Sequence, residues 1–227
     1  MFIGVGNPIP RIANLPGVSR PGGGGGGGGG LAQVDNLYSF EFDGAGAYID
    51  AGNDSSLQFS SSFSVSCWAK INNTGNNAII SKDSNLSNGD GYHIDFRSGN
   101  AVHAWAYNAS DKLIATGLST DTWYHIVFVF ESTGGSNGNQ SLYINAGTPV
   151  TNTITSFQAS TLKNLRIGAS EVLSGFNTDG KIDEVGIFNA ALTATDVQSI
   201  YNATTTGKTA DLNDLSTPPI AWYRMGD

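Results

Sequence analysis

Two neighbouring segments, "GYHIDFR" and "AVHAWAY", carry the side chains best suited to hold a sugar. Polar or aromatic residues alternate with apolar ones in both, which predicts two strands that share one distinctive face. Aromatic rings stack on pyranose rings, while Asp, Arg and His side chains hydrogen-bond to hydroxyl groups. This face predicts a glycan-contact surface, with the alternative that its aromatic residues only cover the sheet or lie in the core. Its members are His93, Asp95, Arg97, His103, Trp105 and Tyr107.

The acidic pair in "EFDG" is the feature closest to a hydrolytic site. Hydrolysis of a glycosidic bond needs two carboxylates that flank the scissile bond, one as acid and one as nucleophile. Glu41 and Asp43 fit the first two positions of an E-x-D-x-(x)-E arrangement, but no third carboxylate follows. The three histidines lie inside predicted strands, and no Ser/His/Asp or metal-protease spacing connects them. We therefore predict a protein that is not an enzyme.

The composition indicates an acidic, all-β chain. The 227 residues are 39% hydrophobic and 13% charged, with 30 glycines and a net charge of −8. Residues 1–30 contain two arginines and no acidic residue, so the negative charge lies in the rest of the chain. An acidic body argues against nucleic acid as a partner, and no apolar stretch is long enough for membrane insertion. Cys67 is the one cysteine, which excludes an intrachain disulfide and predicts a small buried residue.

Short alternating segments, separated by Asn, Gly, Ser and Asp clusters, indicate about a dozen strands. "TWYHIVFVF" is apolar on both faces, which is typical of a central strand in a two-layer sandwich. Thr193 and Asp196 have the spacing of a helix N-cap and its N3 partner, so one short helix is expected after them. The pattern predicts an antiparallel two-sheet jelly-roll sandwich with one short helix near the C-terminus and an extended N-terminal arm.

The order of several motifs carries a family resemblance. The chain resembles a laminin-G-like domain of the concanavalin-A-like lectin/glucanase superfamily from about residue 37 to residue 202. The motifs are "FDGAGAYIDAG", "FSVSCWAKI", "IISK", "TWYHIVFVF", "LYIN", "NLRIGAS" and "GKIDEVGIFNAALTATDVQSIYN". The resemblance implies packed sandwich tryptophans at Trp68 and Trp123. It also implies a Ca²⁺ site that uses Asp43 and Asp183, with the equal alternative that these are acidic strand ends facing water.

The chain departs from that family at its two ends. Such domains commonly begin with an aromatic strand before the "FDG" strand, and nothing like it precedes "YSFEFDG". A similar segment, "IAWYRMGD", stands instead at residues 220–227 and contains Trp222 and Tyr223. This strand closes its own sheet, is donated to a neighbouring subunit, or opens a second domain. We favour the first two, because folds usually cover an unpaired sheet edge.

The N-terminal segment differs from the rest of the chain. Residues 1–21 form a proline-containing arm without a core of its own, so we expect it to dock onto another protein. A polyglycine spacer at 22–30 separates the arm from the sandwich at 31–204, and residues 205–227 form a tail. As a three-per-turn extended chain the nine glycines would span about 28 Å. The apolar anchors of the arm are Phe2, Ile3, Val5, Ile9, Ile12 and Leu15.

An apolar arm, a glycine spacer and a lectin-like sandwich together resemble structural proteins of tailed bacteriophages. The start of the chain does not read as a secretory signal, because Pro8 and Pro10 interrupt its apolar run. We expect a decoration or appendage protein, made in the host cytoplasm and carried on the virion, that adheres to surface polysaccharide. Its partners would be other virion proteins, bound through the arm, and copies of itself, with a trimer favoured. The alternatives are a ligand-free decoration domain and a bacterial sugar-binding adhesion module.

Overall fold

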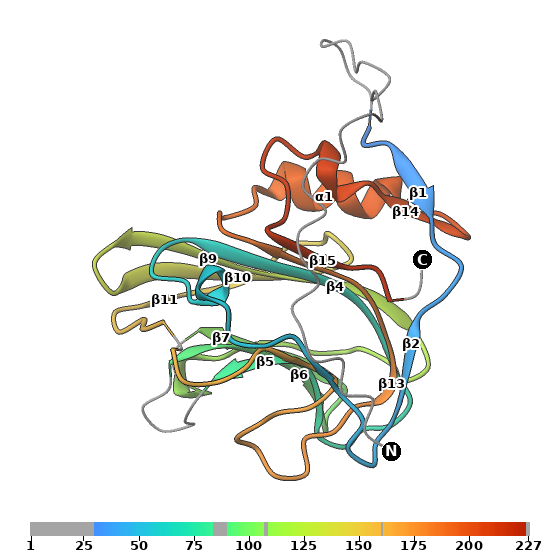
Figure 1. The fold of residues 1–227 in the computed structure, drawn as a ribbon, viewed down its shortest axis with the longest axis horizontal. Helices are drawn as coiled ribbons and strands as arrows, with labels where there is room; N and C mark the ends of the chain where they lie inside the picture. The colour runs from blue at the N-terminus through green and yellow to red at the C-terminus, as the bar shows by residue number, and fades with distance from the viewer. Residues whose placement is uncertain (1–29, 84–89, 107–108, 160, 226–227) are drawn as a thin grey trace.

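The computed structural model describes residues 30–83, 90–106, 109–159 and 161–225. The arm with its anchors, the glycine spacer except Gly30, and Tyr107 lie outside these residues. In the described chain, two antiparallel sheets pack face to face, and a helix covers the outer side of one of them (Figure 1). The jelly-roll sandwich with one helix near the C-terminus is therefore confirmed.

The first sheet, called the front sheet below, has the strand order β3-β12-β5-β6-β7-β8. All of its neighbouring strands are antiparallel. Its strands are β3 (Ile49–Asp50), β12 (Arg166–Ile167), β5 (Asn77–Asp83), β6 (Gly91–Arg97), β7 (Ala101–Ala106) and β8 (Leu113–Ala115).

The second sheet, called the back sheet, has the order β11-β10-β9-β4-β13-β15, and β2 also pairs with β13. In Figure 1 it forms the middle layer, with the front sheet on one side and α1 on the other. Its strands are β11 (Val150–Ile154), β10 (Asn137–Ile144), β9 (Trp123–Gly134), β4 (Phe63–Ile71), β13 (Asp179–Phe188), β15 (Ala221–Tyr223) and β2 (Phe40–Asp43).

Strand alternation decides which side chains enter the core between the sheets. In β4, Phe63, Val65 and Cys67 are fully buried and belong to this core, as the alternating pattern predicts. In β9, Ile126 and Phe128 face the same core. The alternate residues Val127 and Val129 belong to a second apolar cluster on the outer side of the sheet. Strand β9 is therefore covered on both faces and is the central strand that its composition predicts.

The helix α1 (Ala194–Ala203) begins at the predicted N-cap. The Thr193 hydroxyl accepts a hydrogen bond from the Asp196 amide, and the Asp196 carboxylate accepts one from the Thr193 amide. Val197 and Ile200 pack on the outer face of the back sheet in the second apolar cluster. Beside the helix, β1 (Gln33–Asp35) pairs with β14 (Lys208–Ala210). Three short 3₁₀ turns lie at Ser55–Leu57, Ala109–Asp111 and Leu212–Asp214.

The C-terminal segment closes the sheet of its own chain. β15 pairs with β13 through Tyr223 opposite Val185 and Trp222 opposite Gly186. Met225, just beyond the strand, is buried in the core. Of the three arrangements considered for the tail, the structure shows the first. The described part of residues 205–227 is therefore built into the sandwich rather than appended to it.

The expected packing of Trp68 and Trp123 in the core is wrong. Their neighbours Ala69 and Tyr124 take the inward positions, so alternation places both indoles on the outer face of the back sheet. Trp68 is half-buried there, and 37% of the Trp123 surface is exposed.

Candidate functional site

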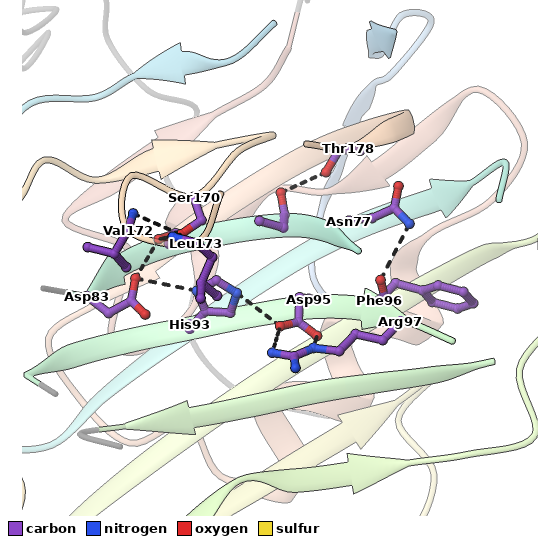
Figure 2. Close-up of polar contacts among 12 residues, drawn as sticks. Asn77, Asp83, His93, Asp95, Phe96, Arg97, Ser170, Val172, Leu173 and Thr178 are labelled. Atoms are coloured by element: carbon purple, nitrogen blue, oxygen red, sulfur yellow. Dashed lines mark hydrogen bonds and ion pairs between the residues drawn. The ribbon is translucent and has the colours of Figure 1, made fainter. Parts of the chain in front are cut away.

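A chain of charged side chains crosses the outer face of the front sheet. The imidazole of His93 on β6 lies between two carboxylates, with its Nδ1 atom 3.5 Å from Asp83 Oδ1 and its Nε2 atom 3.1 Å from Asp95 Oδ2. Arg97 donates two hydrogen bonds to Asp95, from Nε at 2.7 Å and from a terminal nitrogen at 2.6 Å. Figure 2 shows these four residues, which we call the His93 network, in one line along β5 and β6.

Buried partners determine the charge of this network. Burial alone would lower the pKa of His93, but the carboxylates of Asp83 and Asp95 outweigh it and raise that pKa to about 9. Burial would likewise raise the pKa of Asp95, but hydrogen bonds from His93 and Arg97 bring it below its ordinary value. At neutral pH the network thus pairs an imidazolium and a guanidinium with two carboxylates, and its charges balance.

Aromatic rings enclose the network. His93 stacks on Trp105 of β7, with ring centroids 4.3 Å apart and planes 14° from parallel. The Arg97 guanidinium lies 5.4 Å from the centroid of Trp105 and 4.8 Å from that of Phe176. Phe176 belongs to residues 168–178, which connect β12 to β13 and which we call the covering loop.

The covering loop is folded onto the network by its own hydrogen bonds. The hydroxyl of Ser170 accepts bonds from the amides of Val172 at 3.3 Å and Leu173 at 3.0 Å (Figure 2). Ser81 links loop and network, because its hydroxyl lies 2.6 Å from Asp83 Oδ1 and 3.4 Å from Ser170 Oγ. The base of the loop is fixed where Thr178 donates to the carbonyl of Ala78 at 2.7 Å.

The structure brings together five of the six residues expected to contact a glycan. His93 lies opposite Trp105, and Asp95 lies opposite His103, on one face of β6 and β7. However, His93, Asp95 and Trp105 are at most 1% exposed beneath the covering loop, so their expected direct contact with sugar does not fit their burial. Arg97 and His103 are half-buried and reach the surface. Tyr107 lies outside the described residues.

His103 marks the surface edge of this face. Burial is the main cause that lowers its pKa below the ordinary value, so the imidazole is neutral at pH 7. Its Nδ1 atom is buried and has no hydrogen-bond partner among the described residues. The half-buried ring therefore reaches the surface near Arg97 through its exposed part and not through the buried Nδ1 atom.

The two carboxylates expected to bind calcium do not share a site. Asp43 lies opposite Asp179 in the β2–β13 register, and Asp183 is four residues further along β13, about 13 Å away. Asp43 accepts a bond from the Ala45 amide, and Asp183 accepts one from the Glu184 amide. No group of three or more His, Cys, Asp or Glu side chains within the described ranges could hold a metal ion. Calcium binding by either carboxylate stays a prediction.

Glu184 has a structural role that the sequence did not suggest. It adopts a left-handed φ of 51° at an irregularity in β13, and its carboxylate accepts a 2.6 Å hydrogen bond from the Trp222 indole. The Arg224 guanidinium lies 3.5 Å from its other oxygen. Burial, and then the charge of Asp183, raise the pKa of Glu184 to about 7. Glu184 therefore holds the closing strand, and in the sequence it is the last residue of the motif "IDE".

Two packed antiparallel sheets, an outer helix on one and a polar, aromatic face on the other define a lectin-type jelly-roll sandwich. The sequence pattern of the concanavalin A-like lectin/glucanases superfamily, in its laminin-G form, matches residues 43–198. Because this is more than half of the chain, the chain belongs to that family. No curated protein matches the chain by sequence.

Solved structures with the same fold include carbohydrate-binding domains. The CBM40 domain of the Ruminococcus gnavus IT-sialidase, bound to α2,3-sialyllactose, is 11% identical with a TM-score of 0.59, over 76% of this chain and 100% of that one. The botulinum neurotoxin serotype D ligand-binding domain, in complex with N-acetylneuraminic acid, is 15% identical with a TM-score of 0.56, over 77% and 46%. The binding domain of Paraclostridial Mosquitocidal Protein 1 is 16% identical with a TM-score of 0.55, over 77% and 46%. The chain thus spans about half of each toxin domain, and identities this low show the fold alone.

Within the part of the chain that the structure covers, no helix has the length and apolarity needed to cross a membrane.

Proposed function

We propose that this chain is a non-enzymatic glycan-binding protein that uses the outer face of its front sheet. The observation that carries the proposal is the His93 network, which fixes Arg97 between two aromatic rings beside the half-buried imidazole of His103. Two of the five guanidinium N–H groups donate to Asp95, so the others can donate to sugar hydroxyls. The buried members support these groups instead of touching the ligand, since the site gains from side chains that are already held in place.

The comparisons support the class of ligand. The CBM40 domain and the serotype D toxin domain, which share this fold, are described with sialyllactose and N-acetylneuraminic acid. Fold likeness by itself is a weak guide to function. It gains weight because the half-buried Arg97 and His103 reach the surface of the front sheet, and Phe176 of the covering loop lies against Arg97.

We further propose that the protein is carried on a tailed-bacteriophage virion and binds surface polysaccharide. This step rests on the sequence, in which a core-less apolar arm at residues 1–21 and a glycine spacer precede the sandwich. The arm would bind other virion proteins, and copies of the chain, as a trimer, would display several sandwiches at once. Repeated display converts weak sugar contacts into useful avidity. As part of the same proposal, a calcium ion binds at Asp43 or Asp183.

A glycan array tests the binding function. We expect the full chain to bind at least one glycan, and the same array with calcium or with a chelator reports whether the ion takes part. His103→Ala and Phe176→Ala should weaken that binding, whereas Tyr38→Ala, an exposed aromatic residue away from the front sheet, should not. Absence of binding in both conditions would leave the ligand-free alternative.

Deletion of residues 1–21 tests the placement on a particle. We expect the shortened chain to keep its glycan binding, because the closed sandwich begins after the spacer. It should no longer associate with the particle in co-sedimentation. Full association of the shortened chain would contradict the role of the arm.

A further inference from the structure

The outer face of the back sheet carries a second group of aromatic and polar side chains. Inward positions of β4 and β9 are taken by core residues such as Ala69 and Tyr124. The alternate positions therefore face outward, and we call this group the Trp123 surface. Its members are Trp123, Trp68, Tyr201, Lys70 and Lys181.

Strand register places these side chains in two adjoining rows. Trp123, Lys70 and Lys181 lie opposite one another on β9, β4 and β13, and Glu41 on β2 continues the row. Four neighbouring strands span about 14 Å. In the next outward row, Trp68 stands diagonal to Trp123, within reach of a large ring.

The helix fixes the second aromatic ring. Tyr201, near the end of α1, stacks on Trp68 with centroids 5.9 Å apart and planes 14° from parallel. His125 supports Trp68 from the neighbouring strand, with centroids 5.2 Å apart. The helix thus ends in an aromatic stack on the sheet, and Trp123 lies beyond that stack with 37% of its surface exposed.

The chemistry of this surface fits a sugar better than a protein partner. Several large apolar side chains are exposed in the described chain. Among them, only Trp123 belongs to a strand and faces outward on this side of the back sheet. A protein interface needs a broader apolar centre than one such ring. A single aromatic plane among hydrogen-bonding side chains suits the apolar face of one pyranose ring.

The charges around Trp123 indicate a neutral sugar. Lys70 lies 3.8 Å from Asp121, and Lys181 lies 3.8 Å from Glu41. These exposed pairs are loose, so their donors and acceptors remain available to hydroxyl groups. Because each lysine is matched by a carboxylate, and Asp183 opposite Trp68 adds a further acidic group, the surface has no excess positive charge that would select an acidic sugar.

We propose that the Trp123 surface is a second glycan-contact site, which takes a neutral polysaccharide by stacking one pyranose ring on Trp123. This inference rests on the proposed glycan-binding function, and it assigns a place separate from the front sheet. A chain with two such sites on opposite faces can hold two segments of polysaccharide, which strengthens adhesion without a tight single site.

Titration of the full chain with four neutral hexaoses tests this site: maltohexaose, cellohexaose, mannohexaose and xylohexaose. The protein has four tryptophans, so selective ¹⁵N-indole labelling gives a short spectrum in which Trp123→Phe assigns the Trp123 signal. We expect at least one hexaose to shift that signal. Trp123→Ala should weaken binding of the same hexaose about tenfold, in line with loss of a central aromatic contact. Lys70→Ala should weaken it less.

Two controls separate this site from the proposed function. Tyr38→Ala removes another exposed aromatic ring and should leave the affinity unchanged. His103→Ala removes a front-sheet group and should leave the shift of the Trp123 signal unchanged. If a hexaose binds and only His103→Ala weakens it, the Trp123 surface is not a site, although the front-sheet proposal survives. Failure of all four hexaoses to shift the Trp123 signal also overturns the inference, while the glycan array still decides the broader function.

Discussion

Two buried histidines of this protein differ in charge at neutral pH: His93 is cationic and His125 is neutral. Their partners explain the difference. His93 lies between the carboxylates of Asp83 and Asp95, and its pKa rises to about 9. On the back sheet, burial lowers the pKa of His125 to about 3, and its Nε2 atom lies 2.9 Å from the hydroxyl of Ser66. A neutral ring suffices beside a hydroxyl, whereas two buried carboxylates require a cation between them.

The His93 network predicts a loss of stability at alkaline pH. The folded pKa of His93, about 9, lies above the unfolded value of 6.5, so its stabilisation is complete below pH 6.5 and is lost as pH rises through 9. The loss is up to about 3 kcal/mol, from about 1.4 kcal/mol per pKa unit. Urea unfolding at several pH values between 5 and 10 measures it.

His93→Gln is the matched control for that measurement. Gln cannot carry the charge, so this variant should be less stable than wild type at pH 6, and the gap should narrow as pH rises from 6.5 through 9. The comparison is needed because Glu184 and Lys82, with pKa values near 7 and 8, also titrate in this range. A gap that does not change with pH would show that His93 is uncharged in the folded protein.

A substitution at Glu184 is expected to stabilise the folded protein, in contrast to the substitution of His93. Its folded pKa of about 7 exceeds the unfolded value of 4.5, so its contribution is fully present below pH 4.5 and is lost as pH rises through 7. Glu184→Gln keeps an acceptor for the Trp222 indole and removes the buried charge. The raised pKa already includes the attraction of Arg224, so the ionised carboxylate is unfavourable on balance and Glu184→Gln should raise the free energy of unfolding at pH 8 by about 1 kcal/mol. Glu184→Ala should lower it because the indole loses its partner. Equal effects of the two substitutions in urea unfolding would argue against this account.

At the level of strands and helices, the sequence predicts the features that follow a regular residue spacing. Alternation in β4 places Phe63, Val65 and Cys67 in the core, and the spacing from Thr193 to Asp196 marks the start of α1. The covering loop at 168–178 has no such period, so nothing in the sequence shows that it buries His93 and Trp105. Trp68 and Trp123 mislead for another reason, because the family resemblance implied core positions for them, yet their places in the alternation face outward.

Removing the capping box of α1 is expected to cause a modest, local loss of stability. Thr193→Ala removes the hydroxyl that accepts from the Asp196 amide and donates to the Asp196 carboxylate, which costs about 1 kcal/mol in comparable helices. Thr193→Ser retains the hydroxyl and should be nearly neutral in urea unfolding. If both variants are equally destabilised, the methyl group and not the cap carries the effect.

The whole sandwich depends on pairing its two ends around β13. β2, near the start of the described chain, and β15, near its end, both pair with this strand, and β1 pairs with β14 beside the helix. β2 and β15 thus share the edge of β13 that lies opposite β4. Local patterns could suggest this pairing but not decide it, because strand pairing between distant segments depends on the rest of the sheet.

Truncation after Thr217 tests this closure. It removes β15 together with the buried side chain of Met225, and it exposes the edge of β13 from Val185 to Ile187. Loss of this apolar contact should lower the free energy of unfolding by on the order of 4 kcal/mol, and the open edge should promote association of the truncated chains. Thermal unfolding and size-exclusion chromatography measure the two effects, with a chain lacking only residues 226–227 as the control. A synthetic peptide of residues 218–227 should restore the unfolding temperature and the elution volume, because it can pair with the same edge. Unchanged stability and elution after truncation would mean that β15 does not close the sheet.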